Sequence, residues 1–167
     1  MDYFEIDFKL NENLKEDLIA TAITASNQDY YNHYSSKSGS YTNLQFLFSQ
    51  DVNQLTSKLV EAFIEKPEKI AVIMVNPNKI VDWHVDNIKF KRSTVIIFPL
   101  TPHNEDYALC ETKHGIIPFY ECYAFNTNIL HRVVNNSSTR LSLQLFFDID
   151  ILKMYQKYMN GSLIYER

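Results

Sequence analysis

Glycine is scarce in this sequence, and its scarcity excludes several classes of protein. The 167 residues include only three glycines, Gly39, Gly115 and Gly161. A Walker phosphate-binding loop, a dinucleotide-binding GxGxxG turn and a GxSxG nucleophile elbow each need glycines at close, fixed spacing. Three widely separated glycines cannot form any of them, so nucleotide-binding and serine-hydrolase functions are excluded.

Cysteine is also rare. The chain has two cysteines, Cys110 and Cys122, and neither belongs to a CxxC pair. This pattern fits neither a disulfide framework nor a zinc knuckle. We expect two free thiols within strands.

An excess of positive charge and a long apolar run are both missing. The formal net charge is -4, and Lys and Arg do not cluster along one face, so nucleic acid is not an expected partner. No apolar run approaches the ~20 residues of a membrane span, and MDYFEIDFKLNENL does not have the pattern of a signal peptide. We therefore expect a soluble, cytoplasmic protein without a membrane partner.

The composition is that of a folded protein, with 46% hydrophobic, 14% aromatic and 22% charged residues. The length allows one sizeable core, so we expect a single domain over residues 1–167. Within it we distinguish a helical support with a loop (1–69), a strand-rich core (70–148) and a C-terminal helix with a tail (149–167).

Apolar residues at helical spacing mark the first part of the chain. One helix is predicted to begin near Asn13, which forms a capping-box pattern with Glu16, and a second is predicted near residues 51–65, ending before Pro67. Between them, residues 30–41 (YYNHYSSKSGSY) predict a loop. The tyrosine-rich segment 30–44 forms either a lid over a substrate or an ordinary exposed connector.

Strand patterns dominate from residue 70 onward, where β-branched and aromatic runs alternate with turn sequences. The segment ILKMYQKYM then predicts a helix that Asn160 and Gly161 close. Seven strands are expected, at residues 70–75, 80–86, 93–98, 107–111, 116–124, 129–134 and 139–148.

Helices followed by closely spaced strands predict a mainly β, α+β fold. The favoured architecture is a double-stranded β-helix, that is, a jelly-roll, cupin-like barrel with the N-terminal helices packed on one sheet. An immunoglobulin-type sandwich is the alternative, but it would explain neither the helical first third nor the positions of the histidines.

His84 and Asp86 are the first candidate site residues. They stand two residues apart in an expected strand, so both side chains leave the same face. With His131 from another expected strand they would form a two-histidine, one-carboxylate triad, which suits Fe(II) and leaves positions for a co-substrate and O2. An HxD pair alone is a weak signal, and a strand histidine beside a solvated aspartate explains it equally well.

The segment TRLSLQLFF strengthens this interpretation. Arg140, Ser142 and Gln144 alternate with leucines, so one face of the expected strand is polar although neither flank resembles an exposed edge. Polar side chains that point into a barrel need a ligand, and the planar fork of arginine suits a carboxylate. The alternative is a surface arginine on a half-exposed strand.

Three segments together, WHVD, RSTVIIFPL and FNTNILHRVVNNSSTRLSLQLFFD, resemble one branch of the Fe(II)- and 2-oxoglutarate-dependent oxygenases, the aspartyl/asparaginyl β-hydroxylases and proline hydroxylases. The resemblance covers roughly residues 70–148. It implies that His84, Asp86 and His131 bind iron and that Arg140 pairs with the C5 carboxylate of 2-oxoglutarate. It further implies that O2 is consumed, that a small amino-acid-like or peptidyl substrate is hydroxylated, and that succinate and CO2 are released.

Other residues carry weaker expectations. Arg92 falls where family members often have another anion-binding arginine, although KFKR also fits a solvated basic turn. Strand parity makes Ser142 and Thr94 candidates for hydrogen bonds to the co-substrate. Trp83 should point away from the iron ligands and pack in the core. Surface positions are expected for His33, His103 and His114.

Two further functions remain open. A cupin-like metalloprotein would use the same triad without 2-oxoglutarate, whereas a non-catalytic jelly-roll binding module would hold His84 and His131 far apart. A nucleic-acid demethylase is disfavoured, because such enzymes typically place a second arginine six residues after the first, where this chain has Phe146. The sequence leaves the substrate and the oligomeric state open.

Overall fold

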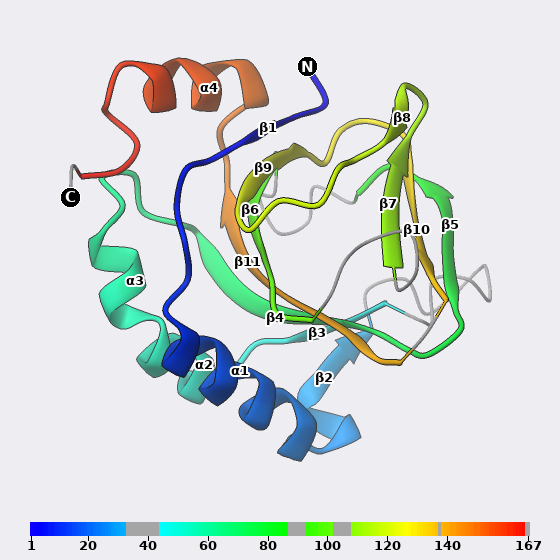
Figure 1. The fold of residues 1–167 in the computed structure, drawn as a ribbon. Coiled ribbons are helices and arrows are strands. Elements are labelled where there is room, and N and C mark those ends of the chain that lie inside the picture. The colour runs from blue at the N-terminus through cyan, green and yellow to red at the C-terminus, as the bar shows by residue number, and fades with distance from the viewer. Residues whose placement is uncertain (33–43, 87–92, 102–107, 137, 166–167) are drawn as a thin grey trace.

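Two antiparallel sheets lie face to face, and the helices lie outside one of them (Figure 1). This arrangement is seen in a computed structural model that describes residues 1–32, 44–86, 93–101, 108–136 and 138–165. Within these residues the two sheets are not joined by strand pairing, so they form a sandwich rather than one continuous barrel. The described helices include none that is both long and apolar enough to cross a membrane.

The strands divide unequally between the sheets. The major sheet contains, in spatial order, β1 (Tyr3–Glu5), β9 (Tyr123–Asn126), β6 (Thr94–Pro99), β11 (Arg140–Phe147), β4 (Lys69–Val75), β3 (Leu44–Leu47) and β2 (Tyr30–Asn32). The minor sheet contains β5 (Ile80–His84), β10 (His131–Asn135), β7 (Ala108–Thr112) and β8 (Gly115–Ile116).

Most predicted strands are present, with two differences. The strand predicted over 116–124 is two strands, β8 and β9, which belong to different sheets. The short strands β1, β2 and β3 were not predicted, because three or four residues carry too little periodicity and owe their conformation to pairing with β9 and β4. Residues 33–43 of the predicted loop and lid lie outside the described residues.

The helices are α1 (Glu12–Thr24), α2 (Gln50–Leu55), α3 (Ser57–Glu61) and α4 (Ile151–Met159), with a 3-10 turn at Asn27–Asp29. The cap of α1 is Asn11 rather than the predicted Asn13, since the Asn11 side chain accepts hydrogen bonds from the first turn. The single helix predicted over 51–65 is broken at Thr56, whose hydroxyl bonds back to Val52. The predicted end of α4 at Asn160 is confirmed.

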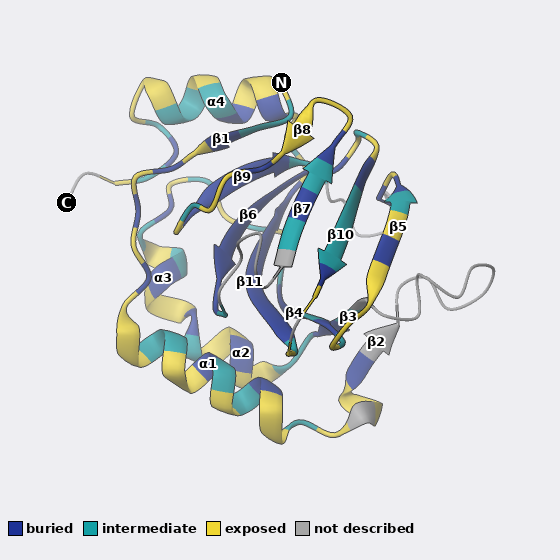
Figure 2. Ribbon diagram, turned by 45° about the vertical axis from the view of Figure 1, so that its right-hand side comes forward, coloured by how far each residue is buried: buried dark blue, intermediate teal, exposed yellow. Residues whose placement is uncertain are grey.

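The major sheet separates two hydrophobic clusters. One lies between this sheet and the helices and includes Leu141, Leu143 and Leu145 of β11. The other lies between the two sheets and includes Phe146 from the opposite face of β11. Every residue of β11 is buried, and Figure 2 shows this strand at the centre of the molecule. Alternation therefore directs Arg140, Ser142 and Gln144 toward the minor sheet.

Candidate metal site

Three side chains meet at one end of the minor sheet. His84 ends β5, His131 begins β10, and the two are direct partners in the antiparallel ladder. Asp86 follows β5, where its N–H donates to the Thr127 carbonyl. The Nε2 atoms of His84 and His131 lie 3.2 and 3.3 Å from the Asp86 carboxylate, and all three residues are at most 8% exposed. The three residues predicted as ligands are therefore brought together.

A β-bulge turns His84 toward the interior. Val133 lies two residues after His131, whereas its partner Val81 lies three residues before His84, so β5 carries one extra residue. Val81 and His84 are both buried, although strict alternation would place them on opposite faces. Bulges re-aim side chains in this way and are frequent beside active sites.

Backbone carbonyls orient both imidazole rings. Nδ1 of His84 bonds to the Asp82 carbonyl at 2.5 Å, and Nδ1 of His131 bonds to the Ile129 carbonyl at 2.8 Å. A carbonyl only accepts, so Nδ1 carries a proton in each ring, and Nε2 is the nitrogen that can bind a metal. The edge of the Phe125 ring packs against His131, with centroids 4.8 Å apart, and limits its rotation.

This donor set fits a divalent metal. Neighbouring ligands that each lie about 2.1 Å from one ion are about 3 Å apart, close to the two separations measured here. All three ligand atoms lie within 4.8 Å of one another. A buried carboxylate with two imidazole nitrogens beside it also favours a cation. Two imidazoles and one carboxylate on one side of the ion are typical of non-haem Fe(II) sites.

Arg140 occupies the interior between the sheets. It is 7% exposed, donates a hydrogen bond to the Tyr123 hydroxyl and lies close enough to Cys110 for its charge to act on that thiol. Cys110 pairs with Val133, two residues along β10 from His131, or roughly 7 Å away. The guanidinium is thus directed to the same interior as the three candidate ligands.

Two groups beside Arg140, the Cys110 thiol and the Tyr123 hydroxyl, are neutral at physiological pH. Burial raises the pKa of the Cys110 thiol to about 11, although the charge of Arg140 opposes the rise. Burial likewise raises the pKa of the Tyr123 hydroxyl above its ordinary value. Tyr123 accepts from Arg140 through its oxygen and keeps its own O–H as a donor. A buried arginine beside a neutral hydroxyl is suited to bind an anion.

Of the weaker candidates for co-substrate binding, only Ser142 is found in the interior between the sheets among the described residues. Ser142 shares the inward face of Arg140, is buried, and accepts a hydrogen bond from Gln144. Thr94 is not brought to this interior: its hydroxyl donates at 2.6 Å to the Ile149 carbonyl, and it shares its face of β6 with Ile96, which packs toward the helices. Arg92 lies outside the described residues, as do His33 and His103.

Trp83 points away from the ligands as predicted, but it is half-buried on the outer face of the minor sheet and is not a core residue. His114 is a surface histidine as expected, with its side chain 81% exposed. Both cysteines are free and buried, also as expected.

Asn135 anchors the turn that leads into β11. It is 2% exposed, and its Nδ2 donates to the carbonyls of Val75, Asn76 and Ser138 at 2.8 to 3.1 Å. Because Val75 is the strand partner of Arg140, these bonds fix the position from which the arginine enters the interior.

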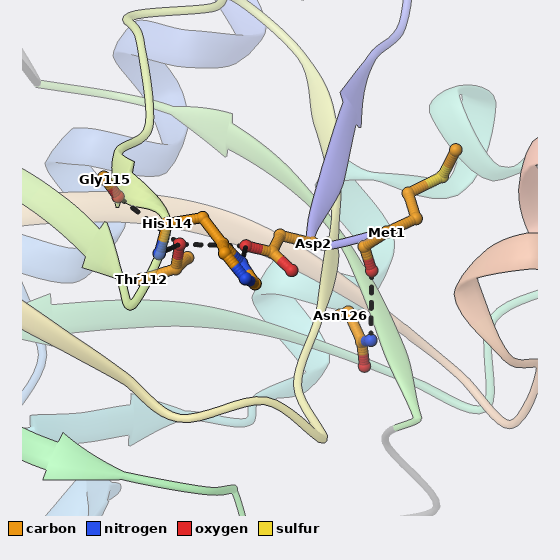
Figure 3. A network of polar contacts seen from close by, with 6 residues as sticks. All are labelled: Met1, Asp2, Thr112, His114, Gly115 and Asn126. Atoms are coloured by element: carbon orange, nitrogen blue, oxygen red, sulfur yellow. Dashed lines mark hydrogen bonds and ion pairs between the residues drawn. The ribbon is translucent and has the colours of Figure 1, made fainter.

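The first residues of the chain connect the two sheets through the polar contacts drawn in Figure 3. The carboxylate of Asp2 accepts hydrogen bonds from Thr112 at 2.9 Å and from His114 at 2.7 Å. Thr112 is the strand partner of His131. Asn126 binds the Met1 carbonyl through its side chain and the Asp2 carbonyl through its backbone. The first residues of the chain therefore support β7 and, through it, the strand that begins with the candidate ligand His131.

Sequence reasoning missed Tyr123 and the supporting network. The strand predicted over 116–124 merged two strands. This hid the pattern in β9, where Tyr123 and Phe125 lie on one face and Ala124 lies on the other. The alternation alone would have placed Tyr123 with Phe125 on the inward face.

Solved structures share this fold. A prolyl-4-hydroxylase from Pseudomonas putida is 16% identical with a TM-score of 0.56, covering 87% of this chain and 91% of its own. A prolyl hydroxylase from Trichoplax adhaerens, in complex with a hypoxia inducible factor peptide fragment, is 11% identical with a TM-score of 0.63, covering 96% of this chain and 87% of its own.

A third match is the non-heme alpha ketoglutarate dependent epimerase SnoN from nogalamycin biosynthesis, 14% identical with a TM-score of 0.58, covering 86% of this chain and 77% of its own. No family model matches the sequence, and no curated protein matches it. These likenesses confirm the predicted jelly-roll fold with helices on one sheet.

Proposed function

We propose that this protein is an Fe(II)- and 2-oxoglutarate-dependent dioxygenase that hydroxylates a small amino-acid-like or peptidyl substrate and releases succinate and CO2. The observation that carries the proposal is the meeting of His84, Asp86 and His131 at one buried point, with both Nε2 atoms directed to the Asp86 carboxylate. The shared fold of 2-oxoglutarate-dependent enzymes supports the choice of iron over other divalent metals.

The residues of this chain have three tasks in that reaction. His84, Asp86 and His131 would hold iron, which supplies the O2 chemistry that protein side chains lack. Arg140 binds the far carboxylate of 2-oxoglutarate, and Tyr123 adds a hydroxyl donor to the same carboxylate. Along β10, the position of His131 and the position opposite Cys110 are roughly 7 Å apart, which matches the length of an extended five-carbon dicarboxylate. The buried surroundings exclude water from the reacting groups.

The substrate class rests on the relatives. Two of the three structures described above are prolyl hydroxylases, and one of them was solved with a peptide. An amino-acid-like side chain is therefore the first choice. Epimerisation is a second candidate, because one structure of the same fold is an alpha ketoglutarate dependent epimerase. Both reactions would begin with removal of hydrogen from a C–H bond and differ in whether oxygen is added.

The first test is anaerobic titration with Fe(II) and then 2-oxoglutarate, recorded in the visible range. The wild type should develop the weak charge-transfer band of the chelated complex, and His131→Ala should not. His114→Ala is the matched control, since it removes an exposed histidine outside the triad. A band that persists in His131→Ala, or no band in the wild type, would refute the proposal.

A second assay separates the alternatives. Succinate release is measured with free amino acids and short peptides, and the product mass is then compared with that of the substrate. Addition of one oxygen atom identifies hydroxylation, whereas an unchanged mass with inverted configuration identifies epimerisation. Metal binding without any response to 2-oxoglutarate would instead favour a cupin-like metalloprotein.

A further inference from the structure

The extra residue in β5 is a β-bulge that other contacts must stabilise. In an antiparallel ladder a shift of one residue moves a side chain to the opposite face. Without the bulge, either Val81 or His84 could point inward, but not both, because residues three positions apart in a regular strand lie on opposite faces. The orientation of His84 therefore depends on a local irregularity that costs ladder hydrogen bonds.

Contacts at the bulge hold it from the outer face of the minor sheet. The backbone N–H of Trp83 donates a hydrogen bond to the side-chain carboxylate of Asp82 at 2.7 Å. The Trp83 ring lies beneath the guanidinium of Arg132, whose Cζ is 5.1 Å from the ring centroid. Arg132 is in turn held by Glu111, its strand partner on β7, through an Nε–Oε2 contact of 2.7 Å.

These contacts lie directly behind the ligands. Trp83 precedes His84, and Arg132 follows His131, so the two residues adjacent to the paired histidines stack on the opposite face of the same two strands. Asp82 has two roles, since its side chain binds the Trp83 N–H while its carbonyl binds Nδ1 of His84. We name Asp82, Trp83, Arg132 and Glu111 the bulge clamp.

We infer that the bulge clamp is a set of positioning residues that keeps the His84 ring directed into the metal site. The inference rests on the proposed function, and none of the four residues touches the reacting atoms. Stacking of Arg132 on Trp83 keeps the indole outward, and the outward indole keeps the next residue, His84, inward. Groups that orient metal ligands from behind typically contribute about ten- to a hundredfold to metal affinity.

The experiment compares Trp83→Leu and Arg132→Met with Trp83→Phe, which keeps a ring under the guanidinium. Val134→Ala is the matched control, because it shortens a half-buried side chain two residues from Arg132 on the same strand. Three quantities are measured for each variant: the melting temperature of the metal-free protein, the affinity for Co(II) from its visible spectrum, and the tautomer of His84 from long-range proton–nitrogen correlations in the metal-free protein.

We expect Trp83→Leu and Arg132→Met to weaken Co(II) binding about tenfold and to lose the Nδ1–H signal of His84. Trp83→Phe should retain most of the affinity. Val134→Ala should lower the melting temperature without changing Co(II) affinity or the His84 signal. Should Trp83→Leu fail to fold, Arg132→Met by itself tests the stack, because it removes the guanidinium that lies 5.1 Å from the ring centroid and leaves the indole in place.

The clamp is refuted if Trp83→Leu and Arg132→Met, or Arg132→Met alone where Trp83→Leu does not fold, keep both wild-type Co(II) affinity and the His84 signal. Wild-type protein that binds neither Co(II) nor Fe(II) would refute the proposed function instead. In that case the His84 signal in the metal-free variants still decides whether the clamp orients the ring.

Discussion

The two faces of β11 carry side chains of opposite character. Toward the helices the strand presents Leu141, Leu143 and Leu145, which belong to the larger hydrophobic cluster. Toward the minor sheet it presents Arg140, Ser142 and Gln144, which are equally buried but polar. Burial of the leucines stabilises the fold, whereas burial of the polar row costs desolvation free energy. The difference indicates that the helix side of β11 contributes most to stability, whereas the side toward the minor sheet is where the proposed function needs its polar groups.

The largest effect should come from the apolar face. Leu143→Ala is expected to lower the free energy of unfolding by about 3 kcal/mol, because Leu143 is fully buried and its loss leaves a cavity. Urea unfolding followed by circular dichroism measures this change. Leu152→Ala, at a leucine of α4 that is 56% exposed, is the control and should have little effect. A fall in 2-oxoglutarate affinity of folded Leu143→Ala would contradict the division between the faces.

Arg140→Met tests the polar face. It should weaken 2-oxoglutarate binding about a hundredfold, since a charge-assisted bidentate pair contributes roughly 2–3 kcal/mol. The iron affinity should remain, because Arg140 is not a ligand of the triad. Anaerobic titration of the visible band measures both constants, and Lys153→Met controls for the loss of one surface cation. Unchanged 2-oxoglutarate affinity would remove Arg140 from the proposed site.

Asn135→Ala should affect both stability and co-substrate binding, because the Asn135 side chain holds the segment from which Arg140 enters the interior. Three carbonyl groups lose their donor, so the free energy of unfolding should fall by about 2 kcal/mol. Because these bonds position the start of β11, 2-oxoglutarate affinity should also fall several-fold. Urea unfolding and the same anaerobic titration measure the two effects. A loss of stability with unaltered affinity would show that the turn does not position Arg140.

The smallest effect should come from Asp2. Burial opposes ionisation of its carboxyl, but hydrogen bonds from His114 and Thr112 outweigh burial and lower the Asp2 pKa below its ordinary 3.8. A lowered pKa in the folded state gives stability that is present above about pH 4 and is lost as the pH falls through the folded-state pKa. Asp2→Asn should therefore cost less than about 1 kcal/mol at pH 7, since the exposed His114 is screened by solvent.

Urea unfolding at pH 7 and at pH 3 measures this pH dependence. The difference between wild type and Asp2→Asn should shrink at the lower pH, where the Asp2 carboxyl begins to protonate. A difference that grows on acidification would reverse the assigned sign.

Prediction from sequence succeeded where a short pattern carries the information. The alternation in TRLSLQLFF correctly separated Arg140 and Ser142 from the leucines, because only one face of β11 is polar. It failed for Thr94, because β6 is buried on both faces and its sequence does not reveal which side faces the minor sheet. It also merged β8 with β9, since apolar residues continue through the irregular segment between them.

The sequence by itself indicated the chemical groups of the candidate site, His84, Asp86, His131 and Arg140, because the HxD spacing and the polar alternation around Arg140 are local patterns. The tertiary structure decided how they meet. The bulge that turns His84 inward, the contact of Arg140 with Tyr123 and the hydrogen bond that Thr112 donates to Asp2 all depend on residues that are far apart in the sequence. Such pairings depend on register and on sheet packing, which are set by contacts across the whole chain and leave no local pattern.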